Sequence, residues 1–176
     1  MTSREFANKI ANGKKDFLQE FIDLLDRSSI SYCVIGGLAV IAYAEPVVSL
    51  DLDLIIASAD RDQLVRSLPK EYSVKQEKHS LNISAPFSDI RVQLQTDPRY
   101  QEFIKRSSRT TVLGYTLSVA SIEDVLQGKL WAYSDPQRRA SKRQKDLADI
   151  MRLIESNPDL LKSEAGRAAQ SIIDRI

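Results

Sequence analysis

Apolar and polar positions follow two different periods along this chain, and the two periods divide it into helices and strands. From residue 4 to residue 27 apolar residues recur at helical spacing, and Gly13 predicts a kink or a break between two shorter helices. Short apolar or alternating runs predict strands at 32–35, 47–56, 72–76, 81–84 and 90–95, with a hairpin around 113–115. Further helices are predicted at 38–44, 61–68, 98–106, from 121 onward, at 138–155 and at 158–176.

Strands and helices alternate over the first two thirds of the chain, and helices fill the last third. This order predicts an α/β (α+β) fold, with a mixed β-sheet flanked by helices. We expect residues 1–120 to form the core with its N-terminal helix. Residues 121–176 are expected to form a helical C-terminal extension packed on that core.

Composition narrows the class of protein without naming a function. The chain has 176 residues, 43% of them apolar and 28% charged, which is typical of a soluble globular domain. The formal net charge of +1 gives no overall field that would favour nucleic acid or a membrane. No apolar run is long enough to span a bilayer and the first residues lack a signal-peptide pattern, so we expect a cytoplasmic protein without a membrane partner.

The chain has one cysteine and one histidine, which limits its metal and redox chemistry. A single cysteine excludes an internal disulfide framework. Cys33 lies in an apolar run, which predicts a buried and unreactive thiol. His79 lies among polar residues and is predicted to be a surface strand residue.

Two carboxylates stand one residue apart in the apolar run at 47–56. On a strand Asp51 and Asp53 point to the same face, with α-carbons roughly 7 Å apart. Two such anions are stabilised by a shared cation, and Mg²⁺ prefers hard oxygen ligands. The alternative is an exposed sheet face that happens to alternate with Asp, because short motifs also match by accident.

A glycine pair ends the strand at 32–35 and begins a helix. Free backbone N–H groups and the helix dipole favour an anion there, and glycine lets the backbone approach a phosphate closely. Alone, Gly36 and Gly37 indicate no more than a helix-packing turn. Together with Asp51 and Asp53 they predict a phosphate cradle beside a metal-binding pair.

The pattern Gly36-Gly37, thirteen residues, Asp51-Leu52-Asp53 resembles the hG[GS] and Dh[DE]h signature of the DNA polymerase beta-like nucleotidyltransferase superfamily. Two later segments, SIEDVLQGKL at 121–130 and RQKDLADI at 143–150, resemble the helical tail of bacterial AbiEii-type and minimal nucleotidyltransferases. The resemblance covers about residues 31–155.

The resemblance implies a nucleotidyltransferase-like sheet and a set of site residues. Asp51 and Asp53 would bind Mg²⁺, in two ions, and Gly36 and Gly37 would bind the triphosphate of an NTP. Ser49 retains a hydroxyl that related sequences carry in an R-x-T-x-D run, and it joins the nucleotide-binding set.

The same resemblance implies two alternative roles for the basic residues of the tail. Lys129 and a member of the pair Arg143 and Lys145 would lie near the triphosphate or would bind helix carboxylates. Asp146 and Asp149 would be tail-packing residues that hold those basic groups.

The implied reaction transfers a nucleoside monophosphate to an acceptor hydroxyl and releases pyrophosphate. The acceptor stays open among tRNA, a protein and a small molecule. The resemblance also suggests a toxin-like member of a toxin–antitoxin pair, with an antitoxin or a second copy of the chain as its partner.

The chain departs from the superfamily pattern at two positions. A third Asp or Glu is expected on a later strand, but the matching run Arg91-Val92-Gln93-Leu94-Gln95 places Gln93 there. An amide cannot accept the proton of the attacking hydroxyl, and loss of a general base typically costs about 10²–10⁴-fold in rate. Asp89 and Asp97 each lie ~13 Å away along an extended strand.

The second departure is Val47, which stands where related sequences often carry the arginine of the R-x-T-x-D run. Gln93 and Val47 support an alternative function, a catalytically impaired nucleotidyltransferase-like binding module that acts through a protein partner. A third hypothesis is a purely structural α/β domain whose acidic pair is coincidental.

Overall fold

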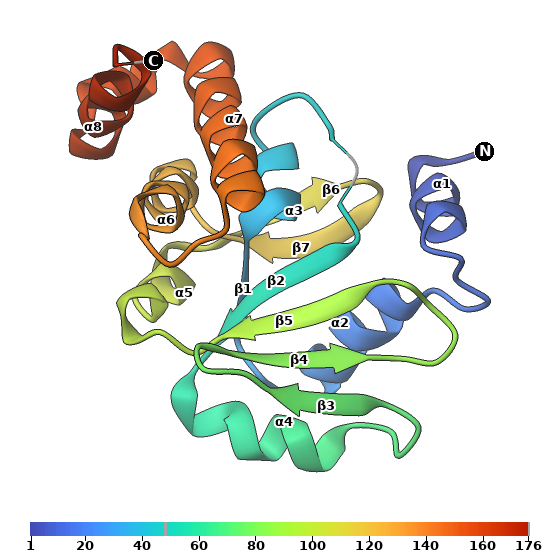
Figure 1. The fold of residues 1–176 in the computed structure, drawn as a ribbon. Coiled ribbons are helices and arrows are strands. Elements are labelled where there is room, and N and C mark those ends of the chain that lie inside the picture. The colour runs from blue at the N-terminus through green and yellow to red at the C-terminus, as the bar shows by residue number, and fades with distance from the viewer. Residues whose placement is uncertain (48, 176) are drawn as a thin grey trace.

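The computed structural model describes residues 1–47 and 49–175. In this part of the chain the strands form one seven-stranded sheet in the order β3-β4-β5-β2-β1-β7-β6 (Figure 1). The β2–β5 and β1–β7 pairs are parallel and the other pairs are antiparallel, so the predicted mixed sheet is confirmed. The strands are β1 (Tyr32–Ile35), β2 (Asp51–Ile56), β3 (Ser73–Gln76), β4 (Ser80–Ser84), β5 (Arg91–Gln95), β6 (Ser108–Val112) and β7 (Tyr115–Val119).

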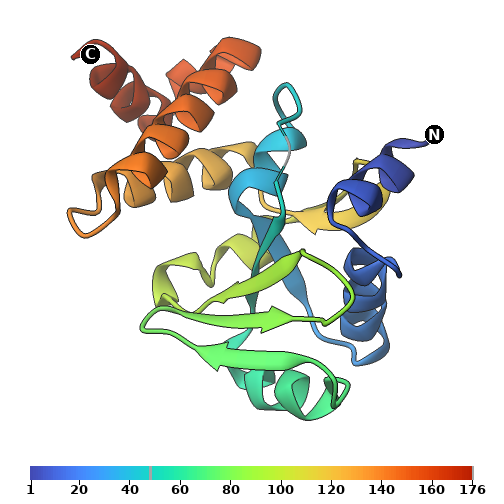
Figure 2. The ribbon, with the colours of Figure 1, turned by 45° about the vertical axis from the view of Figure 1, so that its right-hand side comes forward.

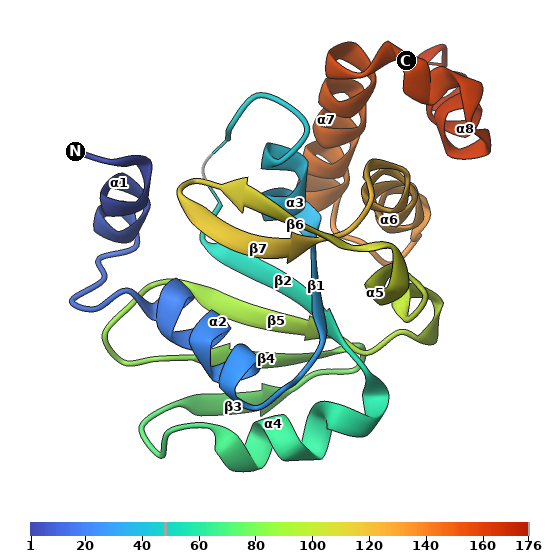
Figure 3. The same cartoon turned by 180° about the vertical axis from the view of Figure 1, so that it is seen from behind.

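Helices surround this sheet (Figure 1). Helix α3 follows β1 directly, with α6, α7 and α8 on one side of it and α1 on the other (Figure 2). Helix α2 crosses the sheet, as the view from behind shows (Figure 3). The helices are α1 (Ser3–Ile10), α2 (Phe17–Arg27), α3 (Gly36–Ile41), α4 (Arg61–Ser67), α5 (Phe103–Arg106), α6 (Ile122–Ser134), α7 (Ala140–Ser156) and α8 (Glu164–Ile173).

The break expected at Gly13 is confirmed, because α1 and α2 are separate helices. The side chain of Asp16 accepts a hydrogen bond from the backbone N–H of Gln19 and so caps the start of α2. The expected hairpin is also present, with Leu113 and Gly114 at positive φ angles of 52° and 83° between β6 and β7.

Several predicted boundaries were wrong. The strand predicted from residue 47 begins at Asp51, where pairing with β5 begins, and position 48 lies outside the described residues. The Ser49 hydroxyl contacts the backbone N–H and C=O of Asp51, at 3.4 and 3.3 Å, and this local turn precedes the ladder.

Two predicted helices are divided. The helix predicted at 98–106 consists of a 3₁₀ turn at Pro98–Tyr100 and the short α5. The helix predicted at 158–176 is a 3₁₀ turn at Pro158–Lys162 followed by α8, whose first turn is capped by the Ser163 hydroxyl. Position 176 lies outside the described residues.

The tail helices pack on the core through α3 and α5. Ser121 caps α6 by accepting a hydrogen bond from the N–H of Asp124. Trp131 stacks on Phe103 with ring centroids 5.8 Å apart and meets Tyr100 edge-on, so it is a packing residue. No helix of the described residues has the length and apolar character needed to cross a bilayer.

The sheet core contains the apolar positions that the alternation predicted. Leu52 and Leu54 of β2 are buried, as are Phe17 and Phe21 of α2. The prediction for His79 was partly wrong, because this exposed residue lies in the turn between β3 and β4 and not in a strand. Polar residues occur both in turns and at exposed strand ends, so the residues around His79 did not distinguish the two.

Cys33 is fully buried, and burial raises the pKa of its thiol from 9.0 to about 12. Because only the thiolate reacts, the native protein at pH 8 should react with a disulfide reagent about 10³-fold more slowly than the unfolded chain. A time course of thiol labelling with and without denaturant measures the ratio. Equal rates would show that Cys33 is accessible in the native state.

Candidate active site

The turn after β1 brings the glycine backbone against a carboxylate of β2. Gly36 has a φ angle of +67°, and Ile35 pairs with Asp53 in the sheet. A β-carbon built on Gly36 would lie 2.1 Å from Oδ2 of Asp53, closer than any real contact. The positive φ angle and the close approach of Asp53 both require glycine at position 36. The first turn of α3 therefore lies directly beside the Asp53 carboxylate.

Replacing Gly36 with alanine should destabilise the fold by about 2–3 kcal/mol, since the left-handed conformation alone costs roughly 1–2 kcal/mol and Asp53 would have to move. Gly37→Ala is the matched variant, because its β-carbon would meet Ser49 Oγ at 3.2 Å without backbone strain. Urea unfolding of the two variants measures the difference. Equal losses of stability would contradict the close contact at Gly36.

Two further predicted residues meet at Gly37. A β-carbon at this position would lie 3.2 Å from Oγ of Ser49 and 3.9 Å from Nζ of Lys145 on α7. The Ser49 hydroxyl lies in the loop before β2, and Lys145 comes from the tail. The structure therefore brings Ser49 and Lys145 together at the glycine turn, although they are 96 positions apart in the sequence.

Asp51 and Asp53 alternate with buried leucines, so both carboxylates lie on the face of β2 opposite Leu52 and Leu54, as predicted. Burial raises the pKa of Asp53, and the negative charge of Asp51 raises it further. Lys129, Lys145 and Lys142 lower the same pKa. Asp53 is thus a desolvated carboxylate whose ionised form depends on surrounding positive charge.

Gln93 lies beside Asp53, because the two are partners in the β2–β5 register. The structure therefore brings Gln93, the residue predicted to replace a third carboxylate, beside Asp53. Asp89 and Asp97 are engaged elsewhere, with Asn12 and Arg99. Within residues 1–47 and 49–175, no group of three or more His, Cys, Asp or Glu side chains could hold a metal ion.

Lys129 is buried between two carboxylates of α7. Its Nζ lies 3.1 Å from Asp146 and 2.7 Å from Asp149, and all three side chains are at most 8% exposed. Of the two readings for Lys129, the structure thus shows the pairing with helix carboxylates. The same charge also acts on Asp53, so Lys129 lies between the tail network and the sheet.

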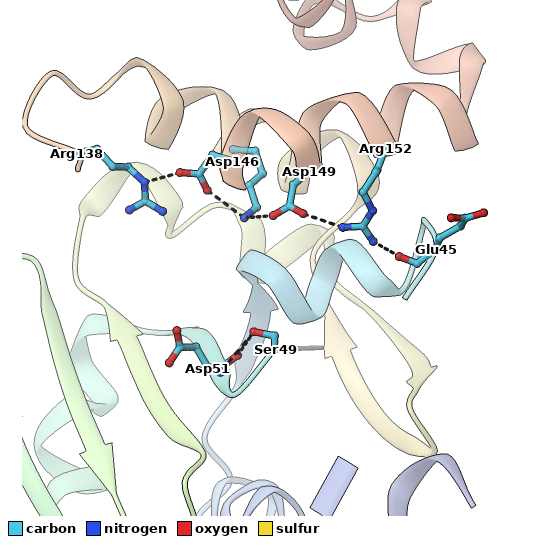
Figure 4. A network of polar contacts seen from close by, with 8 residues as sticks. Glu45, Ser49, Asp51, Arg138, Asp146, Asp149 and Arg152 are labelled. Carbon is cyan, nitrogen blue, oxygen red and sulfur yellow. Dashed lines mark hydrogen bonds and ion pairs between the residues drawn. The ribbon is translucent and has the colours of Figure 1, made fainter. Parts of the chain in front are cut away.

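The network extends from both ends of this triad (Figure 4). Arg138 pairs with Asp146 at one end. At the other end Arg152 pairs with Asp149 at 2.8 Å and donates to the backbone oxygen of Glu45. Since Glu45 lies in the loop that leads to Ser49, the network ties the tail to the loop before β2.

Arg143 does not join this group. Its Nε donates to the backbone oxygen of Tyr133 at 3.0 Å, and its guanidinium lies 5.2 Å from the centre of the Tyr133 ring. Of the predicted pair, Lys145 reaches the glycine turn, while Arg143 contacts the end of α6.

Three charged residues near the site were not predicted. Arg91 pairs with Asp51 at 2.7 Å, Lys142 acts on Asp53, and Arg152 holds Glu45. The signal for Arg91 was present in the sequence, because the alternation at 91–95 places it on the face that carries Gln93. The positions of Lys142 and Arg152 depend on how α7 packs on the rest of the protein, and the local sequence pattern does not define that packing.

Two hollows adjoin the carboxylates. A polar cleft of about 100 Å³ is lined by Gly36, Asp53, Gln93, Lys129 and Arg138, among others. An apolar groove of about 500 Å³ lies between α1, α3 and the loop before β2, and Asp51 is part of its lining. The carboxylate pair thus separates a polar cleft from an apolar groove.

The donor set suits a hard divalent cation. Asp51 and Asp53 supply anionic oxygens, and Gln93 adds a neutral one that can coordinate metal. The Asp53 carboxylate would gain from such a cation, because desolvation penalises its ionised form. The residues therefore fit Mg²⁺.

Solved structures with a similar fold are nucleotidyltransferases. ANT(2'')-Ia, in complex with adenylyl-2''-tobramycin, gives a TM-score of 0.61 at 13% identity, covering 89% of this chain and 96% of that chain. A nucleotidyltransferase-like protein from Paracoccidioides brasiliensis gives 0.57 at 19% identity, covering 99% and 89%. The lincosamide antibiotic adenylyltransferase LnuA, lincomycin-bound, gives 0.55 at 11% identity, covering 80% and 98%. At these identities the comparison establishes the nucleotidyltransferase-like fold.

The sequence pattern of one family, described as "Nucleotidyl transferase AbiEii toxin, Type IV TA system", matches residues 31–172. The match spans most of the chain, and the protein belongs to the AbiEii nucleotidyltransferase family. This confirms the resemblance seen in the glycine, carboxylate and tail motifs. No curated protein sequence matched the chain.

Proposed function

We propose that this protein binds a nucleoside triphosphate with Mg²⁺ and transfers the nucleoside monophosphate to an acceptor hydroxyl. One observation carries the proposal: the Asp53 carboxylate lies directly against the β-carbon-free turn at Gly36, with lysines around it. A phosphate binding site and a metal ligand are then adjacent, as polyphosphate–Mg²⁺ recognition requires. Membership of the AbiEii family supports nucleotidyl transfer as the activity.

In the proposed reaction the acceptor oxygen forms a bond to the α-phosphorus while the bond from that phosphorus to the bridging oxygen breaks. Pyrophosphate leaves, and the hydroxyl proton passes to water because Gln93 cannot accept it. When bound, Mg²⁺ neutralises charge on the phosphoryl oxygens. The backbone N–H groups at Gly36–Gly37, the Ser49 hydroxyl and the Lys145 ammonium would orient the triphosphate.

The acceptor and the partner belong to the same proposal. We propose tRNA, a protein or a small molecule as acceptor, approaching through the groove beside Asp51. The family is described as the toxin of a type IV toxin–antitoxin system, which supports an antitoxin partner. We also propose that residues 1–120 form the core unit and residues 121–176 the tail unit. The tail contributes Lys129 and Lys145 to the site.

The second candidate function is a nucleotide-binding module without transferase activity, favoured by Gln93 beside Asp53. Incubation with each of four labelled NTPs, Mg²⁺ and total cellular RNA or protein separates the two. Labelled product that disappears in Asp51→Ala supports transfer. Mg²⁺-dependent nucleotide binding without any product supports the binding module.

A further inference from the structure

We propose that the site holds one divalent cation instead of two, and that the guanidinium of Arg91 supplies the second positive charge at Asp51. The inference rests on the proposed function and specifies its metal requirement. It comes from two neighbouring residues of β5, Arg91 and Gln93, which face the two carboxylates of β2.

Arg91 is placed on Asp51 by the sheet itself. The two residues are cross-strand partners in the parallel β2–β5 pair, and Nη2 of Arg91 lies 2.7 Å from Oδ1 of Asp51. The Asp51 side chain is 27% exposed and that of Arg91 51%, so the pair lies at the opening of the site. A guanidinium in this position neutralises one carboxylate oxygen without a metal.

Gln93 removes the anion that a second metal would need. It is the partner of Asp53 on one side and of Asn82 on the other, so Asn82, Gln93 and Asp53 form one row across three strands. Oδ1 of Asn82 is buried, and no hydrogen-bond partner for it is found among residues 1–47 and 49–175. An amide at position 93 can donate to Asn82 and still offer its oxygen beside Asp53, whereas an ionised carboxylate there could only accept.

The balance of charge leads to the same conclusion. In the nucleotide-free site Asp51 and Asp53 together carry −2, which one Mg²⁺ neutralises, and Arg91 adds a further +1. Lys142 and Lys145 already contribute positive charge at Asp53. With the nucleotide bound, a second divalent ion would have only the triphosphate and these same two carboxylates as anionic ligands, because the described residues bring no third carboxylate beside them.

Binding of Mn²⁺ to the full chain, counted by electron paramagnetic resonance, tests the inference with and without a nonhydrolysable NTP. The wild type should bind one Mn²⁺ per chain in the presence of the nucleotide. Gln93→Asp should bind a second. Two ions in the wild type would overturn the one-metal assignment, whereas no ion would overturn the proposed function itself.

Arg91→Gln provides the second arm. Removing a competing charge should strengthen Mn²⁺ binding to the nucleotide-free protein by up to about fivefold, as expected for a partly exposed ion pair. Nucleotidyl transfer should fall by about 10²–10³-fold in kcat, and Arg91→Lys should restore part of it. A merely structural Arg91 would leave metal affinity unchanged, and that result would overturn the inference.

Arg99→Gln is the matched control. Arg99 forms a pair of the same length, 2.7 Å, with Asp97, and its side chain is 57% exposed. It lies outside the carboxylate pair, so neither Mn²⁺ affinity nor transfer should change.

Discussion

Lys129→Met should destabilise the protein by about 3 kcal/mol, a large fraction of the stability of a typical domain. The cause is the burial of Asp146 and Asp149, which are 1% and 5% exposed and share the Lys129 ammonium. Without Lys129 the two buried carboxylates lose the cation between them, and Asp146 keeps only Arg138 and Asp149 only Arg152. Urea unfolding followed by circular dichroism measures the loss.

The triple replacement Lys129→Met, Asp146→Asn and Asp149→Asn should recover most of that stability, because it removes the two buried negative charges together with the lysine. Lys105→Ala is the control, since this exposed lysine pairs with Glu102 on the surface and should change stability by less than about 1 kcal/mol. If Lys129→Met and Lys105→Ala have equal effects, the network does not hold the tail on the core.

Asp53→Asn should lower nucleotidyl transfer by about 10³-fold, a barrier increase of ~4 kcal/mol, because it removes the proposed metal ligand beside Gly36. The thermal midpoint should stay the same or rise. Burial raises the pKa of Asp53, so its ionised form costs stability in the folded protein, and a neutral amide of the same shape relieves that cost.

This combination distinguishes a functional carboxylate from a structural one. Asp62→Asn, at an exposed position on α4, is the control and should leave transfer unchanged. A loss of transfer in Asp53→Asn that is matched by a loss of stability would contradict the assignment.

Much of the fold could be predicted because the decisive signals are local. The glycine pair after an apolar run defines the β1–α3 turn, and the alternation of Asp51, Leu52 and Asp53 defines which side chains face the core. Gly13 and Ser121 mark a helix break and a helix start through their own backbone and hydroxyl chemistry. Boundaries were less accurate, as at β2, because the Ser49 hydroxyl turn and the register with Arg91 decide where the ladder begins.

The rest of the site depends on packing between distant segments. From the sequence, the partner of Lys129 could be a triphosphate or the carboxylates of a helix. The packing of α7 on α6 determines that Lys129 contacts the carboxylates. Arg143 and Lys145 looked equivalent among the basic residues of the tail. Their positions on α7 differ, so Arg143 contacts Tyr133 and Lys145 lies near Gly37. The pairing of Arg91 with Asp51 required the strand order, which places β5 beside β2.

Calorimetric titration of nonhydrolysable nucleoside triphosphates, with and without Mg²⁺, tests the central claim most directly. We expect at least one triphosphate to bind the wild type more tightly with Mg²⁺ than without it. In the Asp51→Ala/Asp53→Ala variant that affinity should fall at least tenfold and lose its dependence on Mg²⁺. Equal Mg²⁺-dependent binding by the wild type and this variant would contradict the account.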